Sequence, residues 1–410
     1  MGLRPSGVGP AAAQVSLPVL LAAGLLCCTA SWAQTVPRVA STALPVGNSQ
    51  KSGTPIVYTP GVLNPATGVT TATIRQTDAT SIVDWKSFDI GKAARLDIVQ
   101  PSTSSVLLNK VSGGEFQNQT VIDGVLNANG RVYLYNPNGI IFGKTGTVNV
   151  NSLIASSLKF DENRVRLGLL QPGATPVLAA DPALGRLAGP VLVDGDRLGR
   201  AALNAANGGL ILLAAPQVTN NGAISAPDGQ VMLAAGSKVY LAAPQVSDTG
   251  TSLRGLLVEV SNDDLARLPL AGERTVENGL SGSVAVGRGN ATMIGYAVNQ
   301  KGQVSATTSV NLNGSVYLLP RDQASRGNEP SPYHAGRNGA LVLGPDSVTE
   351  VLPDSADKAT LTASAVFNKS EVKIAGADIA LQAGARIVAP GGNVTISARL
   401  IDLDGAAVQV

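Results

Sequence analysis

Apolar residues recur at every second position in short runs along this chain, and a glycine stands two residues before the first of them. The two-residue spacing is that of a β-strand with one buried face, and the glycine indicates a corner where the strand begins. Helical spacing of three and four residues is nearly absent between 208 and 246. Copies of this Gly-x-[Val/Leu]-x-[Leu/Ile/Val] pattern start at Gly130, Gly208, Gly229, Gly282, Gly314, Gly339 and Gly392.

Two longer stretches resemble one another, and the second has one residue more than the first. Gly222 to Ala235 reads GAISAPDGQVMLAA, and Gly384 to Ala398 reads GARIVAPGGNVTISA. Corners spaced about 20 residues per turn, on one side of each strand, favour a coil in which each rung stacks on the last. A sandwich of two sheets is the alternative. Small Ala, Val and Leu suit the narrow interior of a coil, and Asn and Thr can form ladders between rungs. We therefore predict an all-β, parallel β-helix.

Two ranges interrupt the pattern. Residues 161–207 lack regular strands and are predicted to be an insertion outside the coil. Residues 320–360 carry Pro, Ser and charge, which indicates an exposed, loop-rich boundary. We expect residues 251–319 to continue the coil with extra-helical strands, and residues 361–410 to form further rungs at the start of a longer shaft.

The stretch RVYLYNPNGIIFG, residues 131–143, joins two apolar strands through the tetrapeptide Asn136-Pro137-Asn138-Gly139. Asn is favoured at the first position of a type I turn, Pro sets φ at the second, and Gly has no Cβ at the last. Backbone geometry therefore explains the residue types. Whether the turn is also a recognition element is a separate question.

The composition excludes several classes of protein. The chain is 44% apolar, 14% charged and 3% aromatic, with 46 glycines. A disordered chain has lower hydrophobicity and higher net charge. The formal net charge of +2, without a basic cluster, and the scarcity of aromatic residues argue against nucleic-acid binding.

The N-terminus is typical of a secretory signal peptide over residues 1–33. A single charge, Arg4, precedes an apolar run from Leu17 to Ala30, and small residues before Gln34 suit cleavage between Ala33 and Gln34. The run is shorter than a membrane span of about 20 residues.

Both cysteines, Cys27 and Cys28, lie inside this signal, so the mature chain has none. One explanation is that a large β structure needs no disulfides. Alternatively, a chain that crosses a second membrane unfolded must avoid being cross-linked on the way.

Titratable residues form no recognisable catalytic pattern. The one histidine, His334, excludes two-histidine zinc motifs, and Walker and Rossmann glycine motifs are absent. An enzyme that cleaves polysaccharides would need paired carboxylates on one face. We therefore predict no enzyme, no cofactor and no metal site. The closest acidic groupings are Asp161-Glu162, Asp263-Asp264 and Asp402/Asp404, and Asn-x-Ser/Thr sequons occur at Asn118, Asn290, Asn313, Asn368 and Asn393.

Three segments within residues 78–158 resemble the secretion domain of filamentous-haemagglutinin-type exoproteins, which two-partner secretion exports from Gram-negative bacteria. They are SIVDWKSFDIG (81–91), VQPSTSSVLLNKVSGG (99–114) and VIDGVLNANGRVYLYNPNGIIFGKTGTVNVNSLIASS (121–157), in the order of the family. Later stretches resemble the rungs of large adhesin-like members. The positions that match the family's motifs are Asn136, Pro137, Asn138, Gly139 and Ile140 in the turn, and Trp85, Phe88, Gln100, Pro101, Ser102 and Asn109 before it.

The resemblance implies a right-handed parallel β-helix with an N-terminal β cap, in a secretion domain spanning residues 34–250. It implies export by the Sec machinery, binding of the unfolded domain by an outer-membrane transporter with periplasmic POTRA domains, and an extracellular or surface-attached product. Many members carry an upstream NPNL motif, from which the nearest candidate, Asn64-Pro65-Ala66-Thr67, departs. The ligand of the mature protein cannot be assigned from these residues. An autotransporter passenger and a β-helical polysaccharide-active enzyme are the alternatives.

Overall fold

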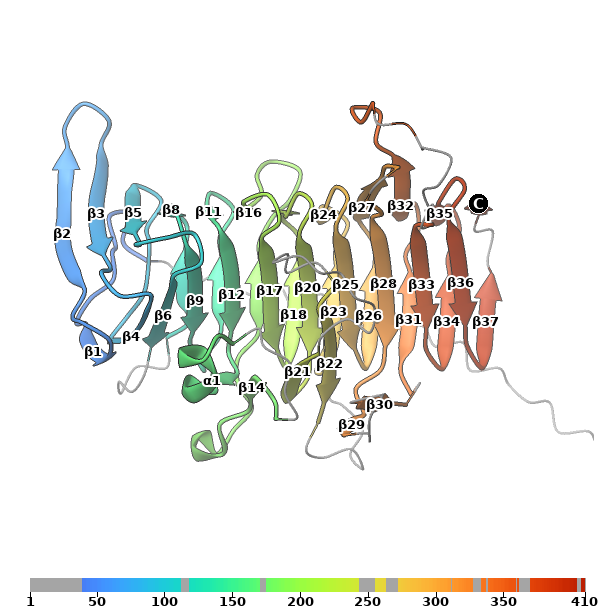
Figure 1. Cartoon of the computed structure of the whole chain (residues 1–410), viewed down its shortest axis with the longest axis horizontal. Coiled ribbons are helices and arrows are strands. Elements are labelled where there is room, and N and C mark those ends of the chain that lie inside the picture. Colours follow the sequence, from blue (N-terminus) through green and yellow to red (C-terminus); the bar gives the residue numbers. More distant parts are fainter. Residues whose placement is uncertain are drawn as a thin grey trace, which may run out of the picture. The chain divides into compact units, whose positions relative to one another are not determined.

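The computed structural model describes residues 39–111, 118–169, 175–242, 255–262, 272–310, 312–326, 333–336, 338–358, 360, 369–403 and 407–409. These residues belong to one compact unit, in which consecutive strands wind into a coil with a parallel sheet along each of three sides (Figure 1). The parallel β-helix predicted from the repeat is therefore confirmed. The predicted signal peptide and its cleavage site at Ala33 and Gln34 lie outside the described residues.

Each rung passes from a first sheet to a second and then to a third, and all three sheets run the length of the coil. The first sheet contains β1 (Ser49–Ser52), β4 (Thr80–Trp85), β6 (Val106–Val111), β9 (Arg131–Tyr135), β12 (Ser152–Ser156), β17 (Leu210–Ala215), β20 (Gln230–Ala235), β25 (Asn290–Gly295), β28 (Ser315–Pro320), β33 (Glu371–Ala375) and β36 (Asn393–Ser397). The second contains β7 (Thr120–Ile122), β10 (Ile140–Phe142), β15 (Val191–Val193), β18 (Gln217–Asn220), β23 (Thr275–Asn278), β26 (Ala297–Gln300), β31 (Ala340–Leu343), β34 (Asp378–Leu381) and β37 (Leu400–Leu403). The third contains β2 (Val57–Asn64), β3 (Val69–Arg75), β5 (Ala94–Val99), β8 (Val125–Ala128), β11 (Thr147–Val150), β16 (Ala202–Ala205), β19 (Ala223–Ser225), β24 (Ser283–Ala285), β27 (Gln303–Thr308), β32 (Val348–Pro353), β35 (Arg386–Val388) and β38 (Ala407–Gln409).

The register between rungs reproduces the period seen in the sequence. Leu210 of β17 lies beside Gln230 of β20, and Glu371 of β33 lies beside Asn393 of β36. The two long repeats occupy equivalent places, since one runs from β19 into β20 and the other from β35 into β36. Because side chains in parallel strands stack in register, alternate positions of every rung face the same interior.

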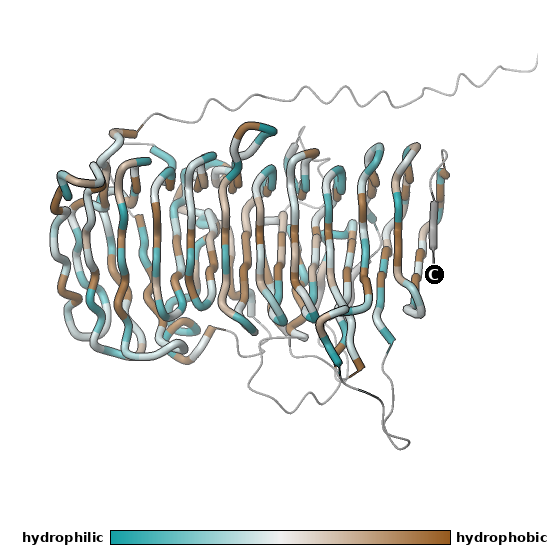
Figure 2. Tube along the Cα trace, turned by 90° about the horizontal axis from the view of Figure 1, so that it is seen from above, coloured by the Kyte–Doolittle hydropathy of each residue, from teal (hydrophilic) through white to brown (hydrophobic). Residues whose placement is uncertain are grey.

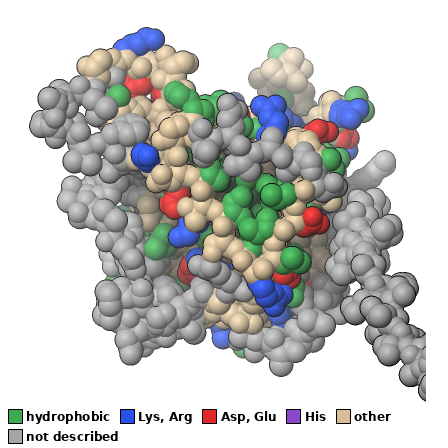
Figure 3. Space-filling model, turned by 90° about the vertical axis from the view of Figure 1, so that its right-hand side faces the viewer, with side chains coloured by type: hydrophobic (Ala, Val, Ile, Leu, Met, Phe, Trp, Pro, Cys, Tyr) green, Lys and Arg blue, Asp and Glu red, His purple; other side chains and the backbone are tan. Residues whose placement is uncertain are grey.

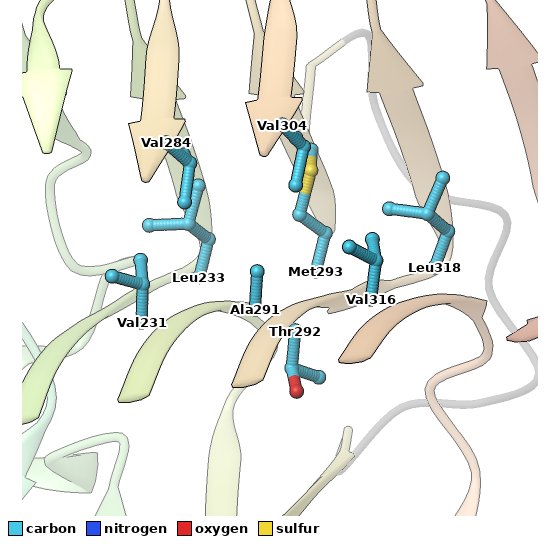
Figure 4. A pocket seen from close by; sticks show the side chains of 9 residues that line it. All are labelled: Val231, Leu233, Val284, Ala291, Thr292, Met293, Val304, Val316 and Leu318. Atoms are coloured by element: carbon cyan, nitrogen blue, oxygen red, sulfur yellow. The ribbon is translucent and has the colours of Figure 1, made fainter. Parts of the chain in front are cut away.

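Small apolar side chains fill that interior. Hydrophobic positions alternate with hydrophilic ones along the strands (Figure 2). In the stretch shown in Figure 4, the Met293 side chain reaches toward Val304 beside the short side chain of Ala291, whereas Thr292 between them points the other way. The side chains that line this part of the interior leave no space for a water molecule. A long side chain beside a short one thus keeps the core at the density of a protein interior.

The corner before the first sheet requires glycine because the rungs approach closely there. A Cβ on Gly229 would overlap the carbonyl oxygen of Gly209 in the preceding rung, and a Cβ on Gly289 would overlap that of Gly229. Gly229 of the repeated pattern is therefore fixed by contact between successive rungs, whereas in the copy that starts at Gly208 it is Gly209 that touches the preceding rung.

Amide ladders link rungs at two places, which confirms the expectation for Asn. At the buried corner between the second and third sheets, Asn220 Nδ2 donates to Asn278 Oδ1 at 2.8 Å, and Asn278 Nδ2 donates to Gln300 Oε1 at 2.7 Å. A second ladder lies on the outer face of the third sheet. It joins Asp97, Asn127, Asn149 and Asn204 through bonds of 2.9, 2.9 and 3.0 Å.

An antiparallel cap closes the N-terminal end of the coil, as the resemblance implies. β1 pairs antiparallel with β4, and β2 pairs antiparallel with β3. Leu44, Ile56 and Tyr58 of this cap pack against the interior core. At the other end of the described chain, hydrophobic side chains gather near the middle of the face that the viewer sees (Figure 3). The last rung leaves Leu400, Ile401 and Leu403 exposed.

Long excursions leave the coil at the corner between the first and second sheets, after β12, β20 and β28. β13 (Lys159–Phe160), β14 (Leu178–Ala179), β21 (Lys238–Ala242) and β22 (Leu257–Ser261) form a separate antiparallel sheet. The first excursion also carries α1 (Glu162–Arg166) and a short 3-10 helix, η1 (Pro182–Leu184). These elements form a second apolar core with the outward-facing side chains of the first sheet.

The expectation that residues 161–207 lie outside the coil is wrong for their second half. Residues 161–190 do belong to the excursion, but β15 and β16 are rung strands. β15 has three residues and β16 four, which is too short to show a clear alternation in the sequence. Within 320–360, the hairpin of β29 (Ala324–Arg326) and β30 (Tyr333–Ala335) lies outside the three sheets, while β31 and β32 are rungs.

The buried ladder predicts unequal costs for two Asn substitutions. Asn278→Ala removes the bond that Asn220 Nδ2 donates and the bond that Gln300 Oε1 accepts in the interior, and should lower the free energy of unfolding by about 2 kcal/mol or more. Asn149→Ala removes bonds of the same kind from an exposed face and should cost less than about 0.5 kcal/mol. Urea unfolding followed by far-UV circular dichroism measures both, and equal losses would contradict the assignment.

Candidate functional site

The Asn136–Gly139 turn is the tight form of the corner at which the excursions leave the coil. It joins β9 of the first sheet to β10 of the second. Gly139 N donates to Asn136 O at 3.0 Å, and Asn136 Oδ1 accepts from Asn138 N at 2.9 Å. φ is positive at Gly139 (109°), but not at Pro137 or Asn138. These features are those of a type I turn reinforced by an Asn side chain, as the sequence predicts.

Asn136 binds the rung that precedes it. Its side-chain Nδ2 donates to Asn118 O at 3.1 Å and to Thr120 Oγ1 at 3.0 Å, and the residue is 1% exposed. The Gly139 carbonyl accepts from Thr120 N at 3.1 Å. An aspartate at position 136 could not donate these bonds, so the amide is needed as well as the turn geometry.

Gly139 meets the rung that follows. A Cβ at this position would lie 2.5 Å from Pro190 O, so glycine is required by contact as well as by φ. Pro190 O accepts from Ile140 N at 3.1 Å, and Gly189 N donates to Pro137 O at 2.9 Å. Ile140 itself is buried in the coil core. The turn is therefore held between two neighbouring rungs.

The strand before the turn is covered on its outer face. Tyr133 stacks on Phe160 of β13, with ring centroids 5.8 Å apart, and Tyr135 meets the same ring edge-on at 6.5 Å. Burial raises the pKa of Tyr133 to about 12, and burial with the nearby Asp181 carboxylate raises that of Tyr135 to about 12. Both phenols are thus neutral under physiological conditions, which suits an apolar contact.

Three of the other motif positions meet at the N-terminal end of the coil interior. Trp85 Nε1 donates to Asn109 Oδ1 at 3.0 Å, and the Trp85 ring packs edge-on against Phe88 at 5.6 Å and Tyr58 at 5.4 Å. Trp85, Phe88 and Asn109 are each 1% exposed. The rings fill the end of the interior beneath the cap, and Asn109 accepts the hydrogen bond of the buried indole. Packing and hydrogen bonding thus explain these residue types.

Gln100, Pro101 and Ser102 lie at a different corner, between the third and first sheets. Gln100 is buried, and its Nε2 donates to Gln76 Oε1 and to Ser105 O, both at 3.0 Å. Ser102 is exposed, and its backbone N donates to Ser105 Oγ at 3.1 Å. Pro101 is exposed beside it. These residues shape the corner between the third and first sheets, whereas Asn136 lies at the corner between the first and second sheets.

The Asn64-Pro65-Ala66-Thr67 stretch forms the exposed hairpin turn between β2 and β3. Asn64 Oδ1 accepts from Ala66 N at 3.0 Å, which is the same local Asn bond as at Asn136. Its side chain shows no bond to another rung among the described residues. The Asn64 and Asn136 turns therefore share the same local Asn bond, but only the Asn136 turn is buried between two rungs.

The acidic groupings have structural roles or lie apart. Asp161 caps α1 by accepting from Asn163 N at 3.0 Å and Arg164 N at 3.2 Å, and Asp402 is exposed on β37. Asp263, Asp264 and Asp404 lie outside the described residues. The backbone of His334 lies in the β29–β30 hairpin. Where the structure describes side chains, no group of acidic, His or Cys residues could hold a metal ion, and no helix there is long and apolar enough to cross a membrane.

Sequence reasoning missed the partners of the turn. Asn118, Thr120, Gly189 and Pro190 carry no repeat pattern, and the last two fall in a range predicted to be outside the coil. Arg186, whose guanidinium donates to Asn138 Oδ1, is equally distant along the chain. Only the Gly-Pro pair at 189–190 hints at a corner in the sequence.

The sequence matches the TPS secretion domain family over residues 44–318, about two thirds of the chain. Two heme/hemopexin-binding proteins of Haemophilus influenzae are 45% and 44% identical to it over 85 residues. Those residues are 21% of this chain, and they span only 9% of the length of either relative. The crystal structure of the HMW1 secretion domain from Haemophilus influenzae aligns with a TM-score of 0.57, over 89% of this chain and 84% of that one, at 17% identity.

The likeness to the HMW1 domain shows a common fold, and the family match takes in the cap, the Asn136 turn and the coil as far as β28. The chain therefore belongs to the TPS secretion domain family, and it carries the secretion domain of an exoprotein that a two-partner system exports through the outer membrane.

Proposed function

We propose that this chain is the N-terminal secretion domain of an adhesin- or haemagglutinin-like exoprotein. The Sec machinery takes it across the inner membrane, and an outer-membrane transporter binds it unfolded through periplasmic POTRA domains. The chain then folds as a coil outside the cell, where it is released or stays attached to the surface. The signal-like N-terminus, the absence of Cys after it and the family match support this order of events.

The observation that carries the proposal is the double attachment of the Asn136–Gly139 turn. It is hydrogen-bonded to Thr120 on one side and contacts Pro190 on the other, so it takes its final form only when successive rungs stack. A coil in which each rung needs only its neighbour can grow stepwise as the chain emerges. Folding on the far side then opposes backward movement of the chain without any nucleotide hydrolysis.

The role we propose involves no catalysis, and it assigns no ligand to the mature exoprotein. The heme/hemopexin-binding relatives share 9% of their own length with this chain. We therefore do not extend their binding of heme or hemopexin to it.

The turn should be required for export. Asn136→Ala removes the bonds to Asn118 O and Thr120 Oγ1, and Gly139→Val places a side chain against Pro190 O. Together they should reduce extracellular protein roughly fivefold or more, since a loss of one or two kcal/mol already changes abundance several-fold. The measurement is immunoblotting of medium and cells that carry the cognate transporter. Asn64→Ala, in the exposed hairpin turn, is the matched control and should be exported normally. Wild-type secretion of the double variant would refute a role for the turn.

The absence of Cys from the mature chain predicts that a disulfide formed before export should block it. Val125 and Thr147 lie side by side on β8 and β11, at a separation that a disulfide can span. Val125→Cys with Thr147→Cys should therefore lower the extracellular yield when the periplasm is oxidising. Added reductant should restore the yield. Each single variant should be exported like the wild type. Undiminished export of the oxidised double variant would show that the chain need not be unfolded.

A further inference from the structure

Most of the Asn136–Gly139 turn and the strands on either side of it are hidden in the folded protein. Asn136 is 1% exposed, and Tyr133, Tyr135, Ile140 and Phe142 are all buried. A partner that reads these buried side chains cannot reach them in the finished coil. Recognition and folding therefore compete for the same groups.

The two sides of the turn are closed by segments on opposite sides of it in the sequence. Asn118 and Thr120 precede Asn136 by 18 and 16 residues, so they can close one side of the turn through a short loop. Gly189 and Pro190 follow it by about 50 residues, after the whole first excursion has passed. The turn can thus be half assembled, with one side open, until this later segment arrives.

Residues 186–190, which we call the cover, contact the turn mainly through backbone. Gly189 N donates to Pro137 O at 2.9 Å, and Pro190 O accepts from Ile140 N at 3.1 Å. A Cβ on Gly189 would overlap the Asn138 carbonyl. Arg186 adds a side-chain bond to Asn138 Oδ1. This close fit leaves no room for a second chain along the same backbone.

The same excursion also covers the outer face of the preceding strand. Phe160 of β13 lies against Tyr133 and Tyr135, and residues 186–190 end the excursion at the turn itself. Phe160 at the start of the excursion and residues 186–190 at its end therefore close the two open sides of the motif. Docking of the excursion would withdraw the whole motif.

We propose that the cover is an intramolecular release device: once the chain is outside the cell, docking of residues 186–190 on the Asn136–Gly139 turn keeps the turn from binding the transporter again. This inference rests on the proposed recognition of the unfolded turn by the transporter. Because the transporter binds only the open form, each unit of free energy that stabilises the cover weakens apparent binding by the same amount. The excursion thus has a purpose in export that is separate from building the coil.

The test compares the full mature chain with two glycine variants, using the purified periplasmic domains of its transporter as the probe. Gly189→Ala pushes the cover off the turn without altering any motif residue. Gly199→Ala is the matched control, since a Cβ there makes only ordinary contact at 3.8 Å. We expect folded Gly189→Ala to bind about tenfold or more tightly than folded wild type, because the binding-competent fraction rises. Gly199→Ala should bind like the wild type, and all three should bind equally when unfolded in urea.

The outcomes separate the two proposals. If folded Gly189→Ala binds no better than the wild type while its unfolded form binds normally, the release device is refuted and recognition of the turn stands. If unfolded wild type and unfolded Asn136→Ala/Gly139→Val bind equally well, the recognition of the turn fails first. Circular dichroism confirms that Gly189→Ala is folded. Should it not fold, Arg186→Ala, which only removes an exposed side-chain bond, decides by the same comparison, and unchanged binding of that folded variant refutes the device.

Discussion

Rung-to-rung hydrogen bonding is the constraint on which the rest of this structure depends. In a parallel coil, the backbone groups of each strand are satisfied only by the rungs before and after it. The backbones must therefore stay in register around every corner, and a side chain that separates two corners breaks the bonds on both sides. Gly229 and Gly289 meet this condition by having no Cβ where successive rungs touch. Asn220, Asn278 and Gln300 meet it because their side-chain amides are hydrogen-bonded from one rung to the next in the interior.

The Asn136 turn follows the same rule, but its contacts join residues that are far apart in the sequence. Its Asn side chain bonds to the rung before, its Gly touches the rung after, and neither bond is local in sequence. The exposed turn at Asn64 uses the same residue types without these contacts. The comparison shows that an Asn-Pro turn by itself does not indicate whether the turn is bound between two rungs. Its position between two rungs makes it sensitive to the order in which those rungs form.

The sequence predicted the parts of the fold that recur. The two-residue alternation and the corner glycines follow from a pattern that repeats along the chain. The copy that starts at Gly208 is out of register by one residue, since Ile211 and not Leu210 pairs with Val231 and faces the coil interior. β15 and β16 could not be found in this way, because three or four residues cannot show a period. The turn at Asn136 was predictable from local backbone preferences. Its partners Thr120 and Pro190 were not, because no propensity links residues that meet only after the coil has closed.

The excursions bury a motif that is not an active site. The sequence predicted residues 161–207 to lie outside the coil. In the part of this range that does, Val165, Leu169, Val177 and Leu178 belong to a second apolar core that covers the first sheet. Such a layer adds burial to a fold whose interior is filled by small residues. It also arrives late, since it must wait for the strands that it covers. In a chain that folds as it emerges, an element that is both late and in contact with an early motif separates two states of that motif in time, and this timing follows from chain order and contact alone.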